Sequence, residues 1–237
     1  GISQDQLIEY NWLFKNKFKE NHLLAIGINS KLNENQNTKY FNSLSIYDHN
    51  LKLINSYNKI NLVPFGEFLP YEMILKKIGL KTITNSYRSY SKGKERNIIE
   101  LNNGNNSIKI LPLICYEIIY SGKIFKNFNF DFIINISEDG WFGHSVGPKQ
   151  HFTHSIFRAV ESGKYVLRSS NNGITAIINP SGIVERQINL NQSGFLDFNE
   201  SRITEPTLFS RFGNKIFTLI ILLYIFLIFS FNRIKDE

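Results

Sequence analysis

The only cysteine of the chain, Cys115, ends the apolar run SIKILPLIC and is followed by Tyr116 and Glu117. A thiol at the end of a predicted buried strand is by default a small apolar core residue. It becomes a nucleophile where a base and a cation stand nearby to favour the thiolate. Both interpretations stay open for this segment alone. A single thiol does exclude an internal disulfide framework and a cysteine-rich zinc site.

Lys59 and Glu67 are the cation and the acid best suited to act with that thiol. They lie in YNKINLVPFGEFLP, where two prolines and a glycine predict a rigid turn that carries Glu67 among aromatic residues. A structural salt bridge between Lys59 and Glu67 is the alternative, and the residues alone do not choose between the two.

A pair of large aromatic residues lies in the glycine-rich loop Gly140 to Gly147. Trp141 and Phe142 follow a predicted strand, and ligands of α/β sheets bind beyond the carboxyl ends of strands. These two rings are therefore candidates for contacting a substrate. Simple packing in the core is the alternative.

Neither a metal nor a nucleic acid is favoured as a partner. His151 and His154 share a predicted helix face near His144, but no acidic ligand has matching spacing, so we expect no metal site. The formal net charge is +7, yet the densest basic cluster, at residues 92–96, has no nucleic-acid-binding motif beside it. We expect a solvated loop there, while attraction to an anionic membrane surface stays open.

The elements that must position these residues alternate in type along the chain. The predicted elements are helices at 4–20, 71–78, 121–128 and 148–162, and strands at 22–28, 40–47, 51–57, 107–115, 131–137, 165–169, 174–179 and 183–188. Pro148 is suited to the first turn of its helix, and residues 80–97 lack periodicity and are predicted to form a loop. The pattern predicts an α/β layered domain with a mixed sheet, continuous over about residues 1 to 200.

The C-terminal run Ile216 to Phe231, IFTLIILLYIFLIFSF, carries no charge. A helix of this length covers about 24 Å of the ~30 Å hydrocarbon core, and snorkelling by Lys215 and Arg233 can make up the difference. Because the run is apolar on every face, we expect a membrane span rather than a buried core helix. The sequence begins at Gly1 without a signal peptide, so we expect a fragment of a longer protein.

Four segments resemble, in this order and at these separations, the nitrilase-like domain of apolipoprotein N-acyltransferases. They are YNKINLVPFGEFLP, LPLICYEIIY, ISEDGWFGHSVGPKQH and LRSSNNGITAIINPSG. Any one of them would indicate only the carbon–nitrogen hydrolase superfamily. The resemblance implies a nitrilase-like α/β/β/α sandwich followed by one C-terminal transmembrane helix. It predicts a catalytic domain at 1–205 without its N-terminal part, a linker at 206–215, the membrane helix at 216–231 and a tail at 232–237.

The resemblance also implies a Glu-Lys-Cys triad. Cys115 matches the nucleophile and Lys59 the triad lysine, while Glu67 and Glu117 match further glutamates that such enzymes require. The family's general-base glutamate lies upstream of the first helix and has no match in this sequence. Glu9, the nearest acid, falls within a helical pattern and is not assigned that role. The residues expected to bind substrate are Tyr116, Trp141 and Phe142.

The function that the resemblance implies is acyl transfer without a cofactor. A phospholipid would give its acyl group to Cys115 as a thioester while Lys59 stabilises the oxyanion. The acceptor would be the N-terminal amine of S-diacylglyceryl-cysteine in an apolipoprotein. The enzyme would lie in the bacterial inner (cytoplasmic) membrane with its catalytic domain on the periplasmic side. The alternatives are a membrane-anchored carbon–nitrogen hydrolase acting on a small amide and, third, a nitrilase-like interaction module.

Overall fold

The computed structural model describes residues 2–14, 17–34, 37–71, 89–103, 106–124, 129–199 and 204–235. The strands in this part of the chain are β1 (Ile2–Ser3), β2 (Leu24–Glu34), β3 (Asn37–Tyr47), β4 (Leu53–Asn58), β5 (Ile99–Asn103), β6 (Asn106–Ile114), β7 (Phe132–Glu138), β8 (Tyr165–Asn171), β9 (Thr175–Ile178) and β10 (Val184–Ile188). The helices are α1 (Gln4–Glu9), α2 (Asn11–Phe14), α4 (Gly147–Ser162), α5 (Leu208–Phe212) and α6 (Lys215–Lys235), with 3-10 turns η1 (Cys115–Ile119) and η2 (Asp139–Phe142).

The strands form two sheets. One has the order β1-β2-β3-β4 and the other the order β10-β9-β8-β7-β6-β5. In the larger sheet β6, β7 and β8 run parallel, and antiparallel strands complete it on both sides. The carboxyl ends of β6 and β7 therefore meet at one edge, where η1 and η2 begin.

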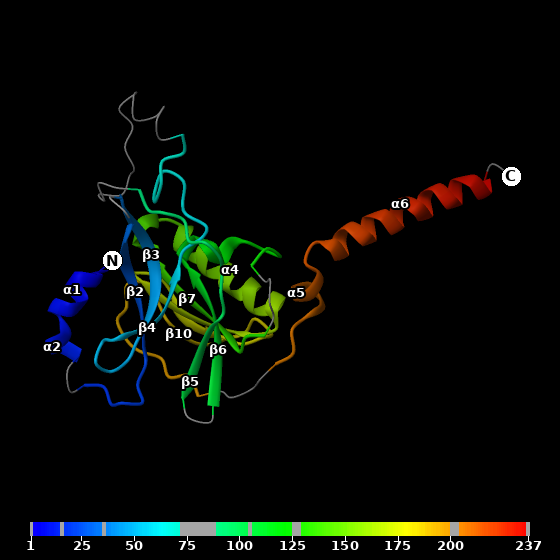
Figure 1. Cartoon of the computed structure of the whole chain (residues 1–237). Helices are drawn as coiled ribbons and strands as arrows, with labels where there is room; N and C mark the ends of the chain where they lie inside the picture. Colours follow the sequence, from blue (N-terminus) through cyan, green and yellow to red (C-terminus); the bar gives the residue numbers. More distant parts are fainter. Residues whose placement is uncertain are drawn as a thin grey trace.

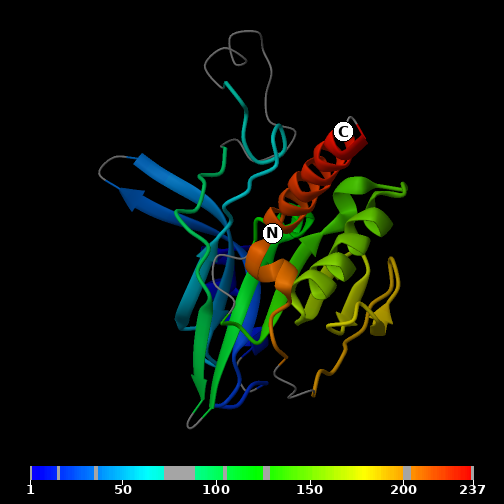
Figure 2. The ribbon, with the colours of Figure 1, turned by 90° about the vertical axis from the view of Figure 1, so that its right-hand side faces the viewer.

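The two sheets pack face to face, with helices on their outer faces (Figures 1 and 2). Leu44 of β3 and Ile110 of β6 belong to the apolar cluster between the sheets. The next residue of β6, Leu111, points to the opposite face, as expected in a strand, and joins the cluster under α4 that includes Ala159. On the other side Leu7 of α1 packs on the smaller sheet. The order of layers is helix, sheet, sheet, helix, and the predicted α/β class with a mixed sheet is confirmed.

Local sequence signals located most elements near the site correctly. The hairpin of β3 and β4, the strands β6 and β7, and α4 with Pro148 in its first turn all form where the pattern predicts them. Strand β5 was missed, because its residues follow directly on the aperiodic loop. Of the predicted helix at 71–78 and loop at 80–97, residues 72–88 lie outside the described part of the chain. Of the predicted helix at 121–128, residues 121–124 form a turn and a bend instead, and residues 125–128 lie outside the described part.

The predicted helix at 4–20 is wrong in its length. Ser3 caps α1 with a capping box, but the helix ends at Tyr10, and α2 ends at Phe14. Only Leu7 in these two helices is buried, and Trp12 is 69% exposed. An apolar stripe holds a long helix together only where it finds a core to cover, and here most of the stripe faces solvent.

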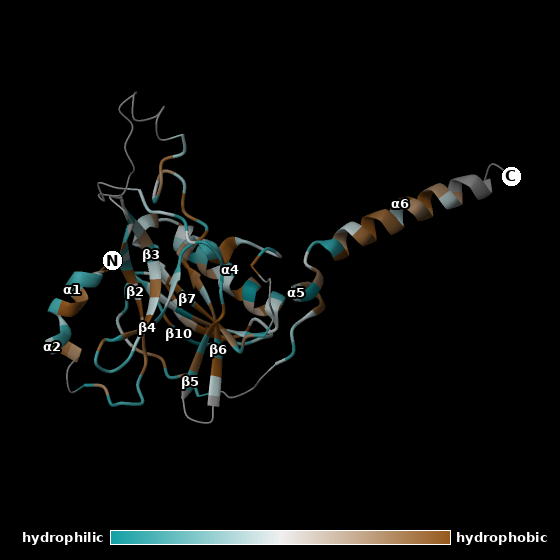
Figure 3. Cartoon of the chain, viewed as in Figure 1, coloured by the Kyte–Doolittle hydropathy of each residue, from teal (hydrophilic) through white to brown (hydrophobic). Residues whose placement is uncertain are grey.

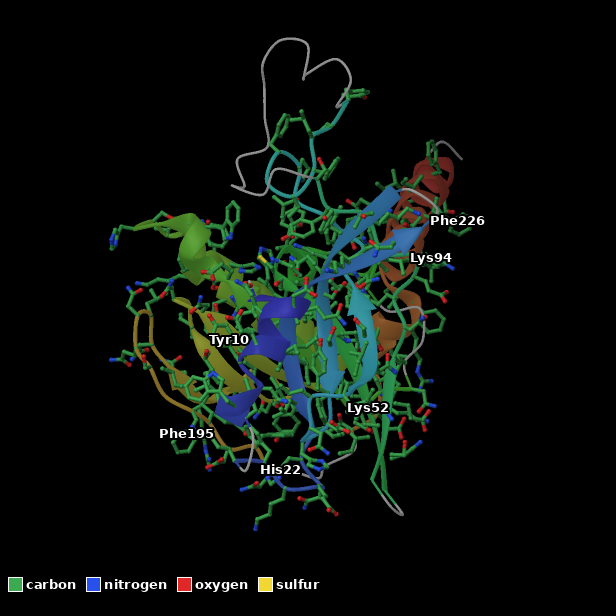
Figure 4. All side chains as sticks on the ribbon, turned by 60° about the vertical axis from the view of Figure 1, so that its left-hand side comes forward. Tyr10, His22, Lys52, Lys94, Phe195 and Phe226 are labelled. Carbon is green, nitrogen blue, oxygen red and sulfur yellow. The ribbon has the colours of Figure 1, made fainter. Side chains whose placement is uncertain are left out.

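Residues 206–231, predicted as a linker and a membrane helix, form α5 and most of α6. Helix α6 projects from the body, and its apolar side chains, Phe226 among them, are largely exposed (Figures 1, 3 and 4). Within the described residues, however, no helix is both long and apolar enough to cross a membrane. The membrane span expected at 216–231 is therefore not supported.

Candidate active site

Cys115 stands at the edge between the two sheets, where β6 ends and η1 begins. Its backbone φ is +49°, in the left-handed region, which costs a residue with a Cβ roughly 1–2 kcal/mol. The side chain is partly buried and packs against the apolar cluster between the sheets. Such a conformation persists only where neighbouring contacts hold it, so the contacts of this turn define the site.

Glu117 ties the Cys115 turn to the segment that follows β4. The side chain is fully buried. Its Oε1 accepts hydrogen bonds from the Tyr57 hydroxyl at 2.7 Å and from the backbone N–H groups of Ile60 at 3.0 Å and Asn61 at 3.1 Å. Its Oε2 accepts from the backbone N–H of Ile114 at 2.9 Å. One carboxylate thus fixes the residue before Cys115 and the two residues after Lys59.

Arg96 supplies the positive charge that this buried carboxylate requires. Its Nη2 lies 2.7 Å from Glu117 Oε1, and its Nε donates to the Tyr57 hydroxyl at 3.2 Å. Burial alone would lower the pKa of Arg96, but the charge of Glu117 and the contacts with Tyr57 together outweigh burial and raise it. Burial and the same carboxylate raise the pKa of Tyr57, so its hydroxyl keeps its proton and acts as a donor.

Lys59 and Glu67 form a buried ion pair. Lys59 is 1% exposed, and its Nζ donates to Glu67 Oε2 at 2.7 Å. Glu67 also accepts from the backbone N–H of Val63 at 2.8 Å and from Asn42 Nδ2 at 2.7 Å. The salt bridge that the sequence left as an alternative is therefore present. An ammonium oriented in this way is equally suited to stabilise an oxyanion, so the two interpretations are compatible.

A cavity of about 350 Å³ lies beside this ion pair. The residues that line it are Ile60, Asn61, Leu62, Phe68, Tyr90, Lys92 and Tyr120.

The segment before β5 is attached to the residues of the ion pair. The backbone N–H groups of Tyr90 and Gly93 donate to the carbonyls of Glu67 and Lys59, at 2.8 and 2.9 Å. A Cβ on Gly93 would meet the Asn58 carbonyl at 2.1 Å, so this close approach requires glycine. The described end of the predicted 80–97 loop thus packs on the site.

The three aromatic residues expected to bind substrate lie on the two 3-10 turns that follow β6 and β7. Tyr116 is partly buried, with its ring edge-on to Tyr120 at 5.4 Å. Burial, with the Tyr116 hydrogen bond, raises the pKa of Tyr120 to about 12. Trp141 is 58% exposed and Phe142 39% exposed, and the Phe142 ring centroid lies 5.4 Å from that of His151. Much of the aromatic surface of η2 is therefore open to a ligand.

Sequence reasoning missed a second buried cluster beside Cys115. Asp139 Oδ1 lies 2.8 Å from His151 Nδ1, and its Oδ2 accepts from Arg168 Nη2 at 2.7 Å. His151 Nε2 lies 3.1 Å from the backbone carbonyl oxygen of Cys115. Burial would raise the pKa of Asp139, but hydrogen bonds with His151 and Ser137 and the charge of Arg168 outweigh it and hold that pKa far below its usual range.

The sequence contained a signal for this cluster. Asp139 and His151 lie in ISEDGWFGHSVGPKQH, and Arg168 lies in LRSSNNGITAIINPSG, two of the segments that carry the resemblance. A Cβ on Gly173 would lie 2.2 Å from Asp139 Oδ2, which explains the glycine of the NNG turn. The available indication of the cluster was that charged residues occur in separate motifs, each close to a tight turn that contains glycine.

Comparisons with known proteins agree with this geometry. The carbon-nitrogen hydrolase family model matches residues 13–198. The chain is 35% identical over 197 residues to an apolipoprotein N-acyltransferase of Rhodopseudomonas palustris, covering 83% of this chain and 36% of the relative. It is also 35% identical over 217 residues to one of Rickettsia prowazekii, covering 91% of this chain and 42% of the relative. The chain thus spans about two fifths or less of the length of these relatives.

Solved structures show the same fold. Saccharomyces cerevisiae Nit3, a member of branch 10 of the nitrilase superfamily, superposes with a TM-score of 0.54 at 18% sequence identity. The superposition covers 80% of this chain and 62% of Nit3. At that identity the likeness concerns the fold alone. It agrees with the two face-to-face sheets described above and with the resemblance that the sequence motifs indicated.

Proposed function

The chain belongs to the carbon–nitrogen hydrolase family, and we propose that it carries the catalytic site of an apolipoprotein N-acyltransferase with Cys115 as the nucleophile. The observation that supports this most is the buried Glu117 network. It joins the strained Cys115 turn to the backbone beside Lys59, which supports a site shared by the thiol and the ammonium. The names of the relatives supply the substrate class.

The proposed reaction has two steps. The Cys115 thiolate attacks the carbonyl carbon of a phospholipid acyl ester, and the Lys59 ammonium stabilises the tetrahedral oxyanion. The intermediate collapses to an acyl thioester, and the departing lysophospholipid oxygen takes up the proton that the Cys115 thiol gave up. The N-terminal amine of an S-diacylglyceryl-cysteine then attacks the thioester, forms an amide and returns the thiol. Glu67 orients the Lys59 ammonium, and Glu117 holds the turn.

Aromatic and apolar surface near the site favours fatty acyl substrates over a small amide. We assign contact with the acyl chains to Tyr116, Trp141 and Phe142, of which Trp141 is mostly and Phe142 partly exposed. The cavity adds the apolar side chains of Ile60 and Leu62. Lipid substrates place the enzyme at a bacterial inner membrane, with the catalytic domain on the periplasmic side. The exposed apolar side chains of α6 would contact lipid there.

In this proposal the layers of sheets and helices carry out acyl transfer, and helix α6 contacts lipid. We keep the boundaries inferred from the resemblance, with the catalytic domain at 1–205, a linker at 206–215 and the apolar helix from 216 to 231. Liposomes made with anionic lipid should retain the protein when α6 is intact. Replacing Leu222 and Phe226 by Lys should release it, because each charge opposes burial of the helix in lipid.

The deciding experiment is covalent labelling from a phospholipid that carries a labelled acyl chain. The complete gene product, in detergent, should acquire a hydroxylamine-sensitive label on the peptide that contains Cys115. Cys115→Ser should lose it, because a serine hydroxyl is far less ionised than a thiol near neutral pH. Lys59→Met should keep an alkylatable thiol but acylate roughly 10²–10³-fold more slowly, as when one oxyanion donor is removed.

Two outcomes would count against this assignment. Label that survives Cys115→Ser would place the nucleophile elsewhere. An unlabelled wild-type enzyme that hydrolyses small amides would identify the protein as an amidase of the same family. Transfer of the label from the thioester to a diacylglyceryl peptide then separates an acyltransferase from an esterase.

A further inference from the structure

We propose that His151 is a positioning residue that holds the backbone carbonyl of Cys115 and thereby orients the nucleophile, with Asp139 and Arg168 fixing the imidazole. This inference rests on the proposed role of Cys115 as the nucleophile. It gives a task to a buried histidine that the acyl-transfer mechanism does not use. His151 is almost fully buried on the inner face of α4 and lies across from η1.

The hydrogen-bond partners decide where the imidazole proton lies. Nε2 is 3.1 Å from the carbonyl oxygen of Cys115, which can only accept, so Nε2 carries a proton and donates. Nδ1 faces Asp139 Oδ1 at 2.8 Å and Arg168 Nη2 at 3.2 Å, so it can donate to the first or accept from the second. In both cases the bond from Nε2 to Cys115 is kept.

The Arg168 side chain that contacts the imidazole is itself anchored. Arg168 is anchored on β8, with its Nη1 bonded to Asn135 of β7 and its Nε donating to the carbonyl of Ile174 at 3.1 Å. Asn135 in turn donates to the Leu113 carbonyl of β6 at 3.1 Å. The cluster therefore fixes His151 relative to the three parallel strands whose ends form the site.

A fixed carbonyl matters because Cys115 has a strained backbone. With φ at +49°, the turn could relax by rotation about the N–Cα bond of Cys115, and this would move both the side chain and the carbonyl that follows it. Glu117 holds the residue before the nucleophile, through Ile114, whereas His151 holds the peptide after it. The two anchors together fix the direction of the Cα–Cβ bond that carries the Sγ atom.

The test is the acylation burst of the complete gene product with p-nitrophenyl butyrate. The Cys115 thiolate forms a thioester with the butyryl group and releases p-nitrophenolate, so the burst rate measures the nucleophile without a phospholipid or a lipoprotein. Two variants separate the contacts of His151. His151→Gln carries its amide N–H group where Nε2 was and keeps the donor to Cys115. His151→Asn carries its amide where Nδ1 was and keeps only the contact with Asp139.

We expect the burst rate of His151→Gln to stay within about 3-fold of wild type and that of His151→Asn to fall roughly 10-fold or more. A tenfold change corresponds to one hydrogen bond of about 1.4 kcal/mol. The variants should differ in burst rate at saturating ester rather than in the apparent affinity for ester. Thermal midpoints recorded beside the rates show how much of each variant is folded.

Equal burst rates for the two folded variants, or a faster burst for His151→Asn, would overturn the inference and make His151 a packing residue. A wild-type enzyme without any burst would remove the nucleophile, and the inference with it. A wild-type burst together with absent phospholipid labelling would instead refute the acyltransferase assignment while leaving the positioning role open to the same pair of variants.

Discussion

Two buried carboxylates flank the Cys115 turn, and they are held in different ways. Glu117 lies between the sheets and Asp139 at the end of β7, and each is paired with a buried arginine, Arg96 or Arg168, at 2.7 Å. Most partners of Glu117 are groups that can only donate a hydrogen bond and cannot accept one. They are three backbone N–H groups and a guanidinium. Asp139 combines its arginine with a hydroxyl and an imidazole.

The difference indicates a division of labour. Backbone N–H groups and a guanidinium fix one arrangement, so Glu117 acts as a rigid link between the nucleophile turn and the Lys59 segment. A hydroxyl can rotate, and Nδ1 of the imidazole can either donate or accept, so the Asp139 side can adjust while Nε2 still donates to the Cys115 carbonyl. In our proposal the first carboxylate sets where the turn lies, and the second sets how the Cys115 side chain points.

The largest expected effect is the loss of stability on neutralising Glu117. Glu117→Gln places an amide N–H₂ group against groups that can only donate, and it leaves Arg96 without its counter-charge. The free energy of unfolding should fall by about 3–5 kcal/mol, as when a buried pair loses one partner. Asp139→Asn likewise leaves the buried Arg168 without its counter-charge, but Ser137 and His151 can accept from the amide, so its loss should be the smaller of the two.

Thermal unfolding measures this difference, at roughly 2–4 °C for each kcal/mol in a domain of this size. Ser181→Ala, in an exposed turn remote from both carboxylates, serves as the control and should leave the thermal midpoint unchanged. The comparison fails if Asp139→Asn is as destabilising as Glu117→Gln, since rigidity of the donors would then not distinguish the two sites.

These two sites also differ in how far the sequence could predict them. Glu117 was found because CYE is a compact motif that matches a family at the nucleophile itself. Asp139, His151 and Arg168 each had an ordinary local explanation, and only the fold brings residues that far apart in the chain into contact. The same limit applies to β5 and to the short α1, which depend on the neighbours they meet rather than on local pattern.

The next effect is an acid dependence specific to Asp139. Its pKa in the folded protein is held below the unfolded value of about 3.9, so its charge stabilises the fold above that pH. This stabilisation is lost as the pH falls through the folded pKa. The difference in thermal midpoint between wild type and Asp139→Asn should therefore be full near pH 7 and shrink below about pH 4. A difference that stays constant down to pH 2 would mean that the pKa of Asp139 is the same in the folded and unfolded states.

The smallest effect comes from the neutral hydroxyl donors, one on each carboxylate. Tyr57 donates to Glu117 Oε1 at 2.7 Å and also accepts from Arg96 Nε, whereas Ser137 donates to Asp139 Oδ1 at 2.6 Å. Tyr57→Phe keeps the buried ring and leaves a guanidinium N–H without a partner, so it should lower the free energy of unfolding by about 2 kcal/mol.

Ser137→Ala removes one hydrogen bond from a carboxylate that keeps His151 and Arg168, so about 1 kcal/mol is expected. Chemical denaturation of both variants at one pH resolves this difference, provided that the denaturant slopes agree with wild type. If Ser137→Ala proves the more damaging, the hydroxyl is what holds Asp139 toward His151. The adaptable side of the site would then depend on a single serine, and the proposed tolerance of Asp139→Asn would have to come from the imidazole alone.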